Sequence, residues 1–312
     1  MTRSPIQPTW RTALVPYLLV SVLWLTYAAL SIWAPTTASN SNPYHLTALT
    51  KDLLVLTIVI PMLVIWLVAV RGALAFQRYA RLIKGSPEAP ALALIAQGLM
   101  WLVGFMIIFI LVGAVTPYLA KESWFPAVVV IRNHLPAYVA LVSATLLYLG
   151  SQRLQTFTRT TTWTAGTILL FVIFALFTVV FTATFTTGSL SSSSSDLLIR
   201  TIPKTGLIFT LIIPYVLSWL LGILACVNIL KYAREVSGII YRSALRWLVL
   251  GIFSVLLFGI LIQVLTLVGR FFTGLSLAPI LATLYIIVVL YGVGFWFIQA
   301  GTRRLAKLEV VE

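Results

Sequence analysis

The sequence predicts an all-α fold: a polytopic membrane helix bundle of eight transmembrane helices, built as a tandem duplication of a four-helix unit. Three observations support this prediction. The chain is 61% hydrophobic and only 9% charged over 312 residues, whereas a soluble domain is about a quarter charged. Long uncharged stretches recur along the chain, and matched residues recur at a fixed offset. A water-facing surface cannot be assembled from this composition.

Eight apolar stretches are long enough to cross the roughly 30 Å of hydrocarbon in a bilayer. Backbone polar groups in lipid must be satisfied within a segment, so each stretch is predicted to be a helix. The first resembles a signal peptide in its basic flank, but it is too long for a signal core and has an internal counterpart, so we expect it to be retained. In chain order the predicted helices centre on 13–33, 53–70, 95–115, 135–150, 163–185, 207–229, 247–269 and 278–298.

Matched residues indicate that the chain contains two copies, 1–152 and 153–312. Pro61 matches Pro214 at an offset of 153 (214 − 61), within similar apolar surroundings. Beyond Pro117 the predicted offset changes to 143, at which Pro136 matches Pro279. A repeat this long indicates a duplicated domain rather than a solenoid. Other pairs at the offset of 153 are Trp10 and Trp163, Lys51 and Lys204, Thr57 and Thr210, Trp66 and Trp219, Tyr79 and Tyr232, and Gly98 and Gly251.

The predicted orientation follows from the helix count and the basic residues. Four helices per copy give both copies the same orientation, as parallel repeats related by a pseudo-two-fold axis along the membrane normal. With the N-terminus inside, fifteen basic residues lie on the cytoplasmic side and six outside, which predicts that both termini are cytoplasmic. We therefore expect a multi-pass protein of the cell membrane. The net charge of +14 indicates contact with anionic lipid headgroups rather than nucleic acid.

The residues that the chain lacks weigh against several kinds of activity. None of the seven acidic residues falls in the middle of a predicted helix, which argues against a pump that carries protons on a membrane carboxylate. The two histidines lie in or beside outer loops, and Cys226 is the single cysteine. No nucleophile–base pair or phosphate-binding loop has usable spacing. We expect no enzymatic activity, no cofactor and no metal site.

The predicted site lies on helix two and its copy, helix six. A proline inside a helix frees the carbonyl four residues earlier, and both of those residues are threonine. Pro-interrupted helices at corresponding positions of two halves are a pointer to a substrate site. We expect both helices to bend before the proline and to face each other or a shared central space. Kinks that only shape packing are the alternative. The candidate binding residues are Thr57, Pro61, Trp66, Thr210, Pro214 and Trp219.

Paired basic residues are predicted at both ends of these helices. Lys51 and Lys204 stand at the outer mouth, where they would concentrate anions and repel cations. The inner ends carry Arg78 and Arg81 in one copy and Lys231 and Arg234 in the other. These four form either a basic ring that admits an anion or side chains that reach lipid headgroups and set the topology.

Two function classes remain open from the sequence. The first is a transporter or channel for a neutral or anionic small solute or lipid. The alternative is a non-catalytic receptor, sensor or scaffold subunit of a larger membrane assembly, with a small-molecule ligand or a membrane protein as partner. An intramembrane enzyme is the least supported. A polar cavity between the copies would favour the first class, and a solid apolar bundle would favour the second.

Overall fold

The described part of the chain is entirely helical. The computed structural model describes residues 60–115, 125–156, 211–236, 238–259, 264 and 277–306. In these ranges the elements are α3 (Ile60–Leu82), α4 (Ala89–Val115), α5 (Phe125–Thr156), α9 (Ile213–Glu235), α10 (Ile239–Ile252), the π-helix η4 (Phe253–Gly259) and α12 (Leu277–Ala306). The described residues contain no strand, which confirms the all-α prediction for this part of the chain.

Four of the described helices are long and apolar enough to cross a membrane, which indicates an integral membrane protein. They span Met62–Leu82, His134–Gln155, Ile213–Glu235 and Ile239–Leu256, and Ala89–Gly104 is a shorter apolar helix. The helices predicted around 13–33 and 163–185 lie outside the described residues. The total of eight spans therefore stays a prediction.

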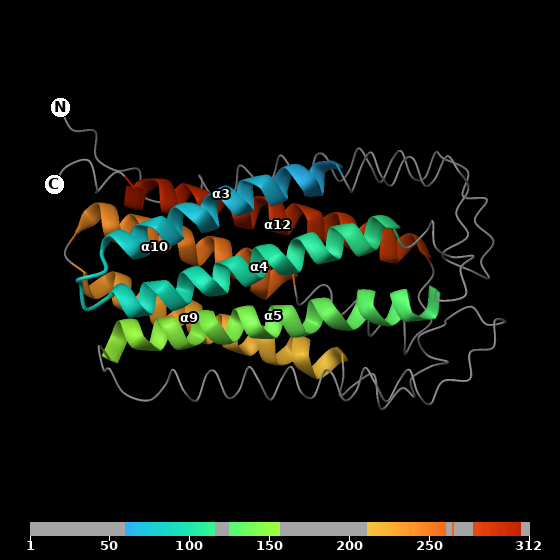
Figure 1. Ribbon diagram of the computed structural model, residues 1–312, viewed down its shortest axis with the longest axis horizontal. Helices are drawn as coiled ribbons and strands as arrows, with labels where there is room; N and C mark the ends of the chain where they lie inside the picture. The colour runs from blue at the N-terminus through green and yellow to red at the C-terminus, as the bar shows by residue number, and fades with distance from the viewer. Residues whose placement is uncertain are drawn as a thin grey trace.

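The described helices pack as a closed ring with their axes along the long dimension of the molecule (Figure 1). In order around the ring, α3 packs on α4, α4 on α5, α5 on α9, α9 on α10 and η4, α10 and η4 on α12, and α12 on α3. One hydrophobic core fills the inside of this ring and takes buried side chains from every one of these helices. The core lies between the two predicted copies as well as within each of them.

Small residues bring the backbones of α4 and α5 close together. A Cβ on Gly98 would lie 3.0 Å from the carbonyl oxygen of Ser143, and a Cβ on Gly150 would lie 2.8 Å from that of Ala91. The hydroxyl of Ser143 donates a 2.7 Å hydrogen bond to the carbonyl of Gly98. Glycine and serine at helix contacts are typical of membrane bundles, where close van der Waals packing drives association.

The same contacts recur between α10 and α12. A Cβ on Gly251 would lie 2.5 Å from the carbonyl oxygen of Gly294. A Cβ on Gly301 would lie 2.8 Å from the carbonyl oxygen of Ala244. From α4 to α10 these positions correspond at an offset of 153 (251 − 98 and 244 − 91), and from α5 to α12 at an offset of 151 (294 − 143 and 301 − 150).

The offset of 143 predicted for the last helix is wrong for this packing. It rests on matching Pro136 with Pro279 and Leu147-Tyr148 with Leu290-Tyr291, whereas the close contacts of α5 and α12 correspond at 151. At 151 the segment Gly150–Leu154 matches Gly301–Leu305, reading Gly-Ser-Gln-Arg-Leu and Gly-Thr-Arg-Arg-Leu. In each segment the hydroxyl after the glycine bonds to the carbonyl three residues earlier. Between α5 and α12 the difference from 153 is therefore two residues rather than ten.

Candidate functional site

The helices α3 and α9 correspond residue for residue. Each has 23 residues, and α9 begins 153 residues after α3 (213 − 60). Pro214 stands at the start of α9, where a missing N–H leaves no hydrogen bond of the regular α-helix broken, and Pro61 is the second described residue of α3. Before Pro214, residues 211–212 form a wider π-helical turn. The regular α-helix therefore starts at the residue before the proline.

Four of the predicted site residues lie outside the described residues. They are Thr57 and Thr210, with the predicted free carbonyls, and Lys51 and Lys204 at the predicted outer mouth. Their roles stay predictions.

Corresponding faces of α3 and α9 point into the common core. Met62 and Phe76 of α3 are buried there, and so are Tyr215 and Ile229, which stand at the same positions of α9. The opposite faces carry large exposed apolar side chains at corresponding positions. These are Leu63, Val64, Leu67 and Leu74 of α3, and Val216, Leu217, Leu220 and Val227 of α9. Both helices thus present one face to the core and one to the surroundings.

Trp66 and Trp219 lie at corresponding positions on the core side of these helices. Each is half-buried and packs against the central core. The indole Nε1 atom of each is buried and has no hydrogen-bond partner. An unpaired buried donor costs about 1–3 kcal/mol, and the two helices carry such a donor at the same position. Trp247 also has such a nitrogen, but its counterpart at the offset of 153 is Leu94.

A carboxylate joins the two predicted copies at one end of the ring. Glu88 lies in the turn between α3 and α4, and its Oε1 accepts a hydrogen bond from the hydroxyl of Tyr232 in α9. Its Oε2 accepts one from the hydroxyl of Tyr241 in α10 at 3.1 Å. The two tyrosine rings meet edge to face, with their centroids 6.3 Å apart. Buried Tyr79 of α3 corresponds to Tyr232 at the offset of 153.

Two further polar side chains connect α5 to α9. The amide of Asn228 donates to the hydroxyl of Ser151 at 3.3 Å, and the amide of Gln155 donates to the carbonyl of Asn228 at 3.2 Å. Some buried hydroxyls bond within their own helix, such as Ser218 to the carbonyl of Pro214 at 2.7 Å, and that of Ser143 bonds across to α4. The described core is otherwise filled mainly by apolar side chains.

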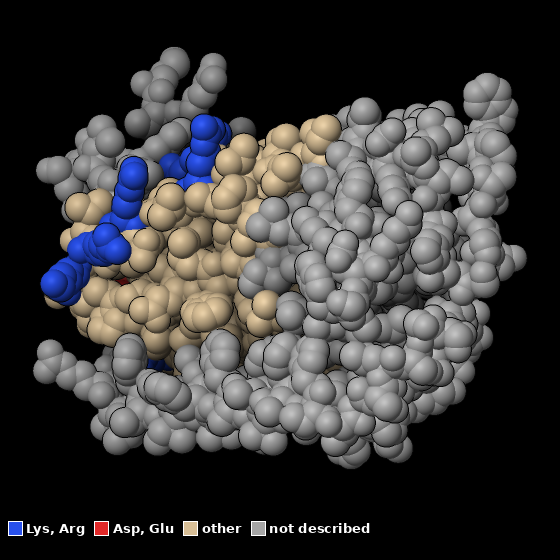
Figure 2. Space-filling view, turned by 45° about the vertical axis from the view of Figure 1, so that its right-hand side comes forward, with Lys and Arg blue, Asp and Glu red and all other residues tan. Residues whose placement is uncertain are grey.

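The predicted basic residues of the inner end are all exposed. Arg78 and Arg81 of α3 and Lys231 and Arg234 of α9 lie on the surface. Lysine and arginine gather at one end of the described part (Figure 2). The structure brings none of these four side chains into the core. An inner basic ring and contact with headgroups both stay predictions.

Within the described ranges, no group of three or more His, Cys, Asp or Glu side chains could hold a metal ion. Comparisons with protein-family models, with curated proteins and with solved structures find no match.

Sequence matching overlooked the contact of Glu88 with Tyr232 and Tyr241. Glu88 and Tyr241 occupy the same position of the two copies, at the offset of 153, but they differ in chemistry, and identity was the signal used. The sequence does contain a signal for this contact: Glu88 and Tyr241 stand at matching positions, and so do Tyr79 and Tyr232.

Proposed function

We propose that this protein transports or conducts a neutral or anionic small solute or lipid across the cell membrane, through a site shared by two copies of a four-helix unit. The observation behind the proposal is the pair Trp66 and Trp219, whose buried N–H groups lack acceptors. A carbonyl, hydroxyl or anionic oxygen of a ligand would satisfy both donors. None of the buried side chains in the described residues is a carboxylate that would attract a cation.

The duplication is part of this proposal. Support comes from the corresponding faces of α3 and α9 and from the repeated glycine contacts of α4 with α5 and of α10 with α12. Parallel repeats related by an axis along the membrane normal place a substrate site at their interface. In the ring α3 and α9 belong to different copies and share one core, so that Trp66 and Trp219 would flank that interface.

Hydrogen bonds cross the end of the ring that carries Glu88. Its carboxylate bonds to tyrosines of α9 and α10, and the excess of basic residues predicts that this end faces the cytoplasm. A solute that crosses by alternating access would need these bonds to break when the cytoplasmic end opens. The filled core then represents a state closed toward the cytoplasm.

A receptor, sensor or scaffold subunit is the second candidate. It is favoured by the apolar core, which fills the ring wherever the structure describes it. The exposed apolar faces of α3 and α9 would serve such a protein as contacts for partner helices as well as for lipid.

Flux through proteoliposomes distinguishes the two candidates. Liposomes holding the purified protein would be tested with chloride, phosphate, lactate, glycerol and potassium. We expect at least one anion or neutral solute to cross and potassium to be excluded. Trp66→Phe with Trp219→Phe should reduce that flux at low solute concentration. The loss of each bond to an anion weakens binding by about ten-fold or more.

The matched control is Trp101→Phe, which changes an exposed tryptophan of α4 and should leave flux unchanged. If none of these solutes crosses faster than in empty liposomes, the scaffold candidate is the better one. Equal flux in wild type and the double variant would remove the tryptophan pair from the transport site.

A further inference from the structure

On the outside of the ring, the line where α3 meets α12 and the line where α9 meets α5 differ in charge, and each line with its flanking side chains is called a groove below. Arg71 of α3 corresponds to Leu224 of α9 (224 − 71 = 153), and Arg303 of α12 corresponds to Gln152 of α5 (303 − 152 = 151). The groove between α3 and α12 therefore carries two arginines where the groove between α9 and α5 carries neutral residues. The fold does not need these charges, because the corresponding helix pair packs without them.

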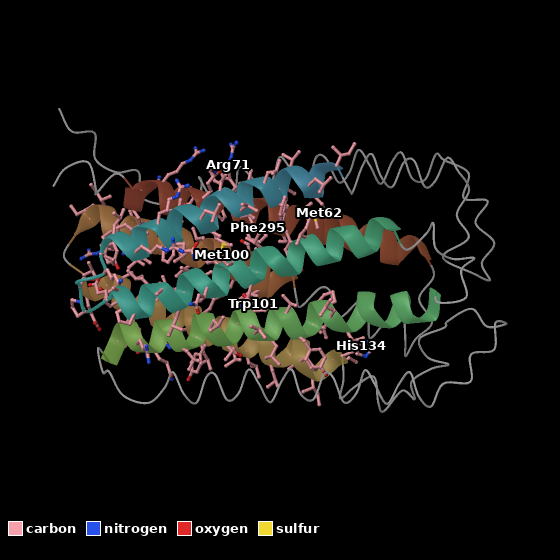
Figure 3. The ribbon with its side chains drawn as sticks, viewed as in Figure 1. Met62, Arg71, Met100, Trp101, His134 and Phe295 are labelled. Atoms are coloured by element: carbon pink, nitrogen blue, oxygen red, sulfur yellow. The ribbon has the colours of Figure 1, made fainter. Side chains whose placement is uncertain are left out.

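Both arginines flank the line where α3 meets α12. A Cβ on Gly72 would lie 3.4 Å from the Cα and N atoms of Gln299, so that these two residues are in contact. Arg71 directly precedes Gly72, and Arg303 follows Gln299 by about one helical turn. Both arginines are exposed, and Arg71 projects away from the bundle (Figure 3).

A third arginine and exposed apolar side chains lie on the same faces of these helices as Arg71 and Arg303. Residues seven apart lie on one face of a helix, about 10 Å apart along it. On α3 this spacing places Val64 and Arg78 on either side of Arg71, and on α12 it places Trp296 before Arg303. Val64 is 57% exposed and Leu67, about one turn along α3, is 54% exposed, whereas the ring of Trp296 packs edge to face on Trp247 of α10. Three guanidinium groups thus stand beside apolar surface that runs toward the other end of the bundle.

An arginine inside a membrane-spanning helix needs an anion or a route to water. Arg71 lies inside the candidate span Met62–Leu82, and a charge in the middle of a membrane helix costs about 2.5–3.5 kcal/mol. The described residues hold two acidic side chains, Glu88 and Glu235. Glu88 is bound by tyrosines, and Glu235 ends α9, which does not pack in this groove. The described residues therefore offer no carboxylate in this groove, and an external anion would supply a partner for both arginines.

We propose that the groove between α3 and α12 binds one anionic phospholipid of the leaflet at the basic end. Arg71 and Arg303 hold the phosphate, Arg78 adds charge nearer the surface, and the acyl chains lie along Val64 and Leu67. The exposed apolar surface favours a phospholipid over a free anion, since acyl chains bind to apolar side chains and a free anion does not. The groove faces the surroundings rather than the core, so this inference does not depend on the proposed transport.

Lipid binding to the purified full-length protein in detergent tests the proposal. Phosphatidylglycerol, phosphatidylcholine and inorganic phosphate would be titrated, with bound lipid counted by native mass spectrometry. Wild type should prefer phosphatidylglycerol. Arg71→Leu with Arg303→Gln, which gives this groove the residues of the other one, should weaken phosphatidylglycerol binding by about 25-fold, at roughly five-fold per arginine.

The matched control for a single arginine is Lys84→Gln, which removes one exposed charge in the turn after α3 and should change binding by less than about three-fold. Arg303→Gln alone serves if the double variant does not fold, with an expected five-fold loss. Unchanged binding in the groove variants would overturn the proposal, and so would equal losses in the control. Competition by inorganic phosphate as strong as that of the lipid would point to a free-anion site and contradict the phospholipid.

Discussion

Replacing Gly251 by alanine tests how closely α10 packs on α12. The new Cβ would lie 2.5 Å from the carbonyl oxygen of Gly294 and 2.9 Å from the nitrogen of Ile298, whereas ordinary contact begins at 3.4 Å. Both atoms belong to the backbone of α12, so that helix must move away by about 0.9 Å (3.4 − 2.5). Overpacking of this kind costs about 1–3 kcal/mol, and the better helix propensity of alanine returns up to about 1 kcal/mol. We expect a net loss of about 1–2 kcal/mol in the free energy of unfolding.

Unfolding in mixed micelles with increasing SDS measures this free energy. Gly104→Ala in α4 is the matched control, because nothing lies within 4 Å of a Cβ built there. That change should be neutral or stabilising by up to about 1 kcal/mol, so the two substitutions should have opposite signs. If Gly251→Ala is as harmless as Gly104→Ala, the close approach of α10 and α12 is wrong.

Three further predictions address the closed end, the topology and the outer mouth. A double-mutant cycle between Glu88→Ala and Tyr241→Phe should give a coupling energy of about 1–2 kcal/mol in the same unfolding assay, since a hydrogen bond to a carboxylate is lost; additive effects would show that the bond contributes nothing. Single cysteines placed at Arg81 and Arg234, in a background without Cys226, should react with impermeant thiol reagents only from the cytoplasmic side, and cysteines at Ser191–Ser195 only from outside; labelling of Arg81→Cys from outside would reverse the topology. If anion flux is found, Lys51→Gln with Lys204→Gln should reduce it most at low ionic strength, where charge attraction is least screened; flux that is unchanged at low salt would remove their steering role.

The duplication itself stays a prediction, but the pattern behind it agrees with the burial of α3 and α9. Pro61 with Pro214 and Trp66 with Trp219 gave the offset of 153, and at that offset Met62 and Tyr215 are both buried while Leu67 and Leu220 are both exposed. Long apolar stretches predicted helices at most of the described positions, because backbone in lipid has few alternatives. The orientation of Trp66 and Trp219 toward the core could not be predicted from the pattern, since both sides of these helices are apolar.

Neighbour relations could not be predicted. Every predicted helix is apolar on most of its surface, so hydropathy does not reveal that α5 packs on α9 or that α12 packs on α3. The offset of the last helix was wrong because Pro136 and Pro279 match by residue type, whereas the packing depends on Gly150 and Gly301. The missing acceptors of the two indoles are a property of the packed core and leave no trace in the sequence.

Cross-linking of cysteine pairs tests the ring arrangement, on which the shared site depends. Ile65→Cys with Gly292→Cys joins α3 to α12, since a Cβ on Gly292 would lie 3.0 Å from Ile65. Gln155→Cys with Asn228→Cys joins α5 to α9, where the two residues are hydrogen-bonded. In membranes, in a background without Cys226, both pairs should cross-link within one chain under a short thiol reagent, and Ile65→Cys with Asn228→Cys should not. Cross-links that form only between chains, or in neither of the first two pairs, would contradict a ring in which each copy packs on the other.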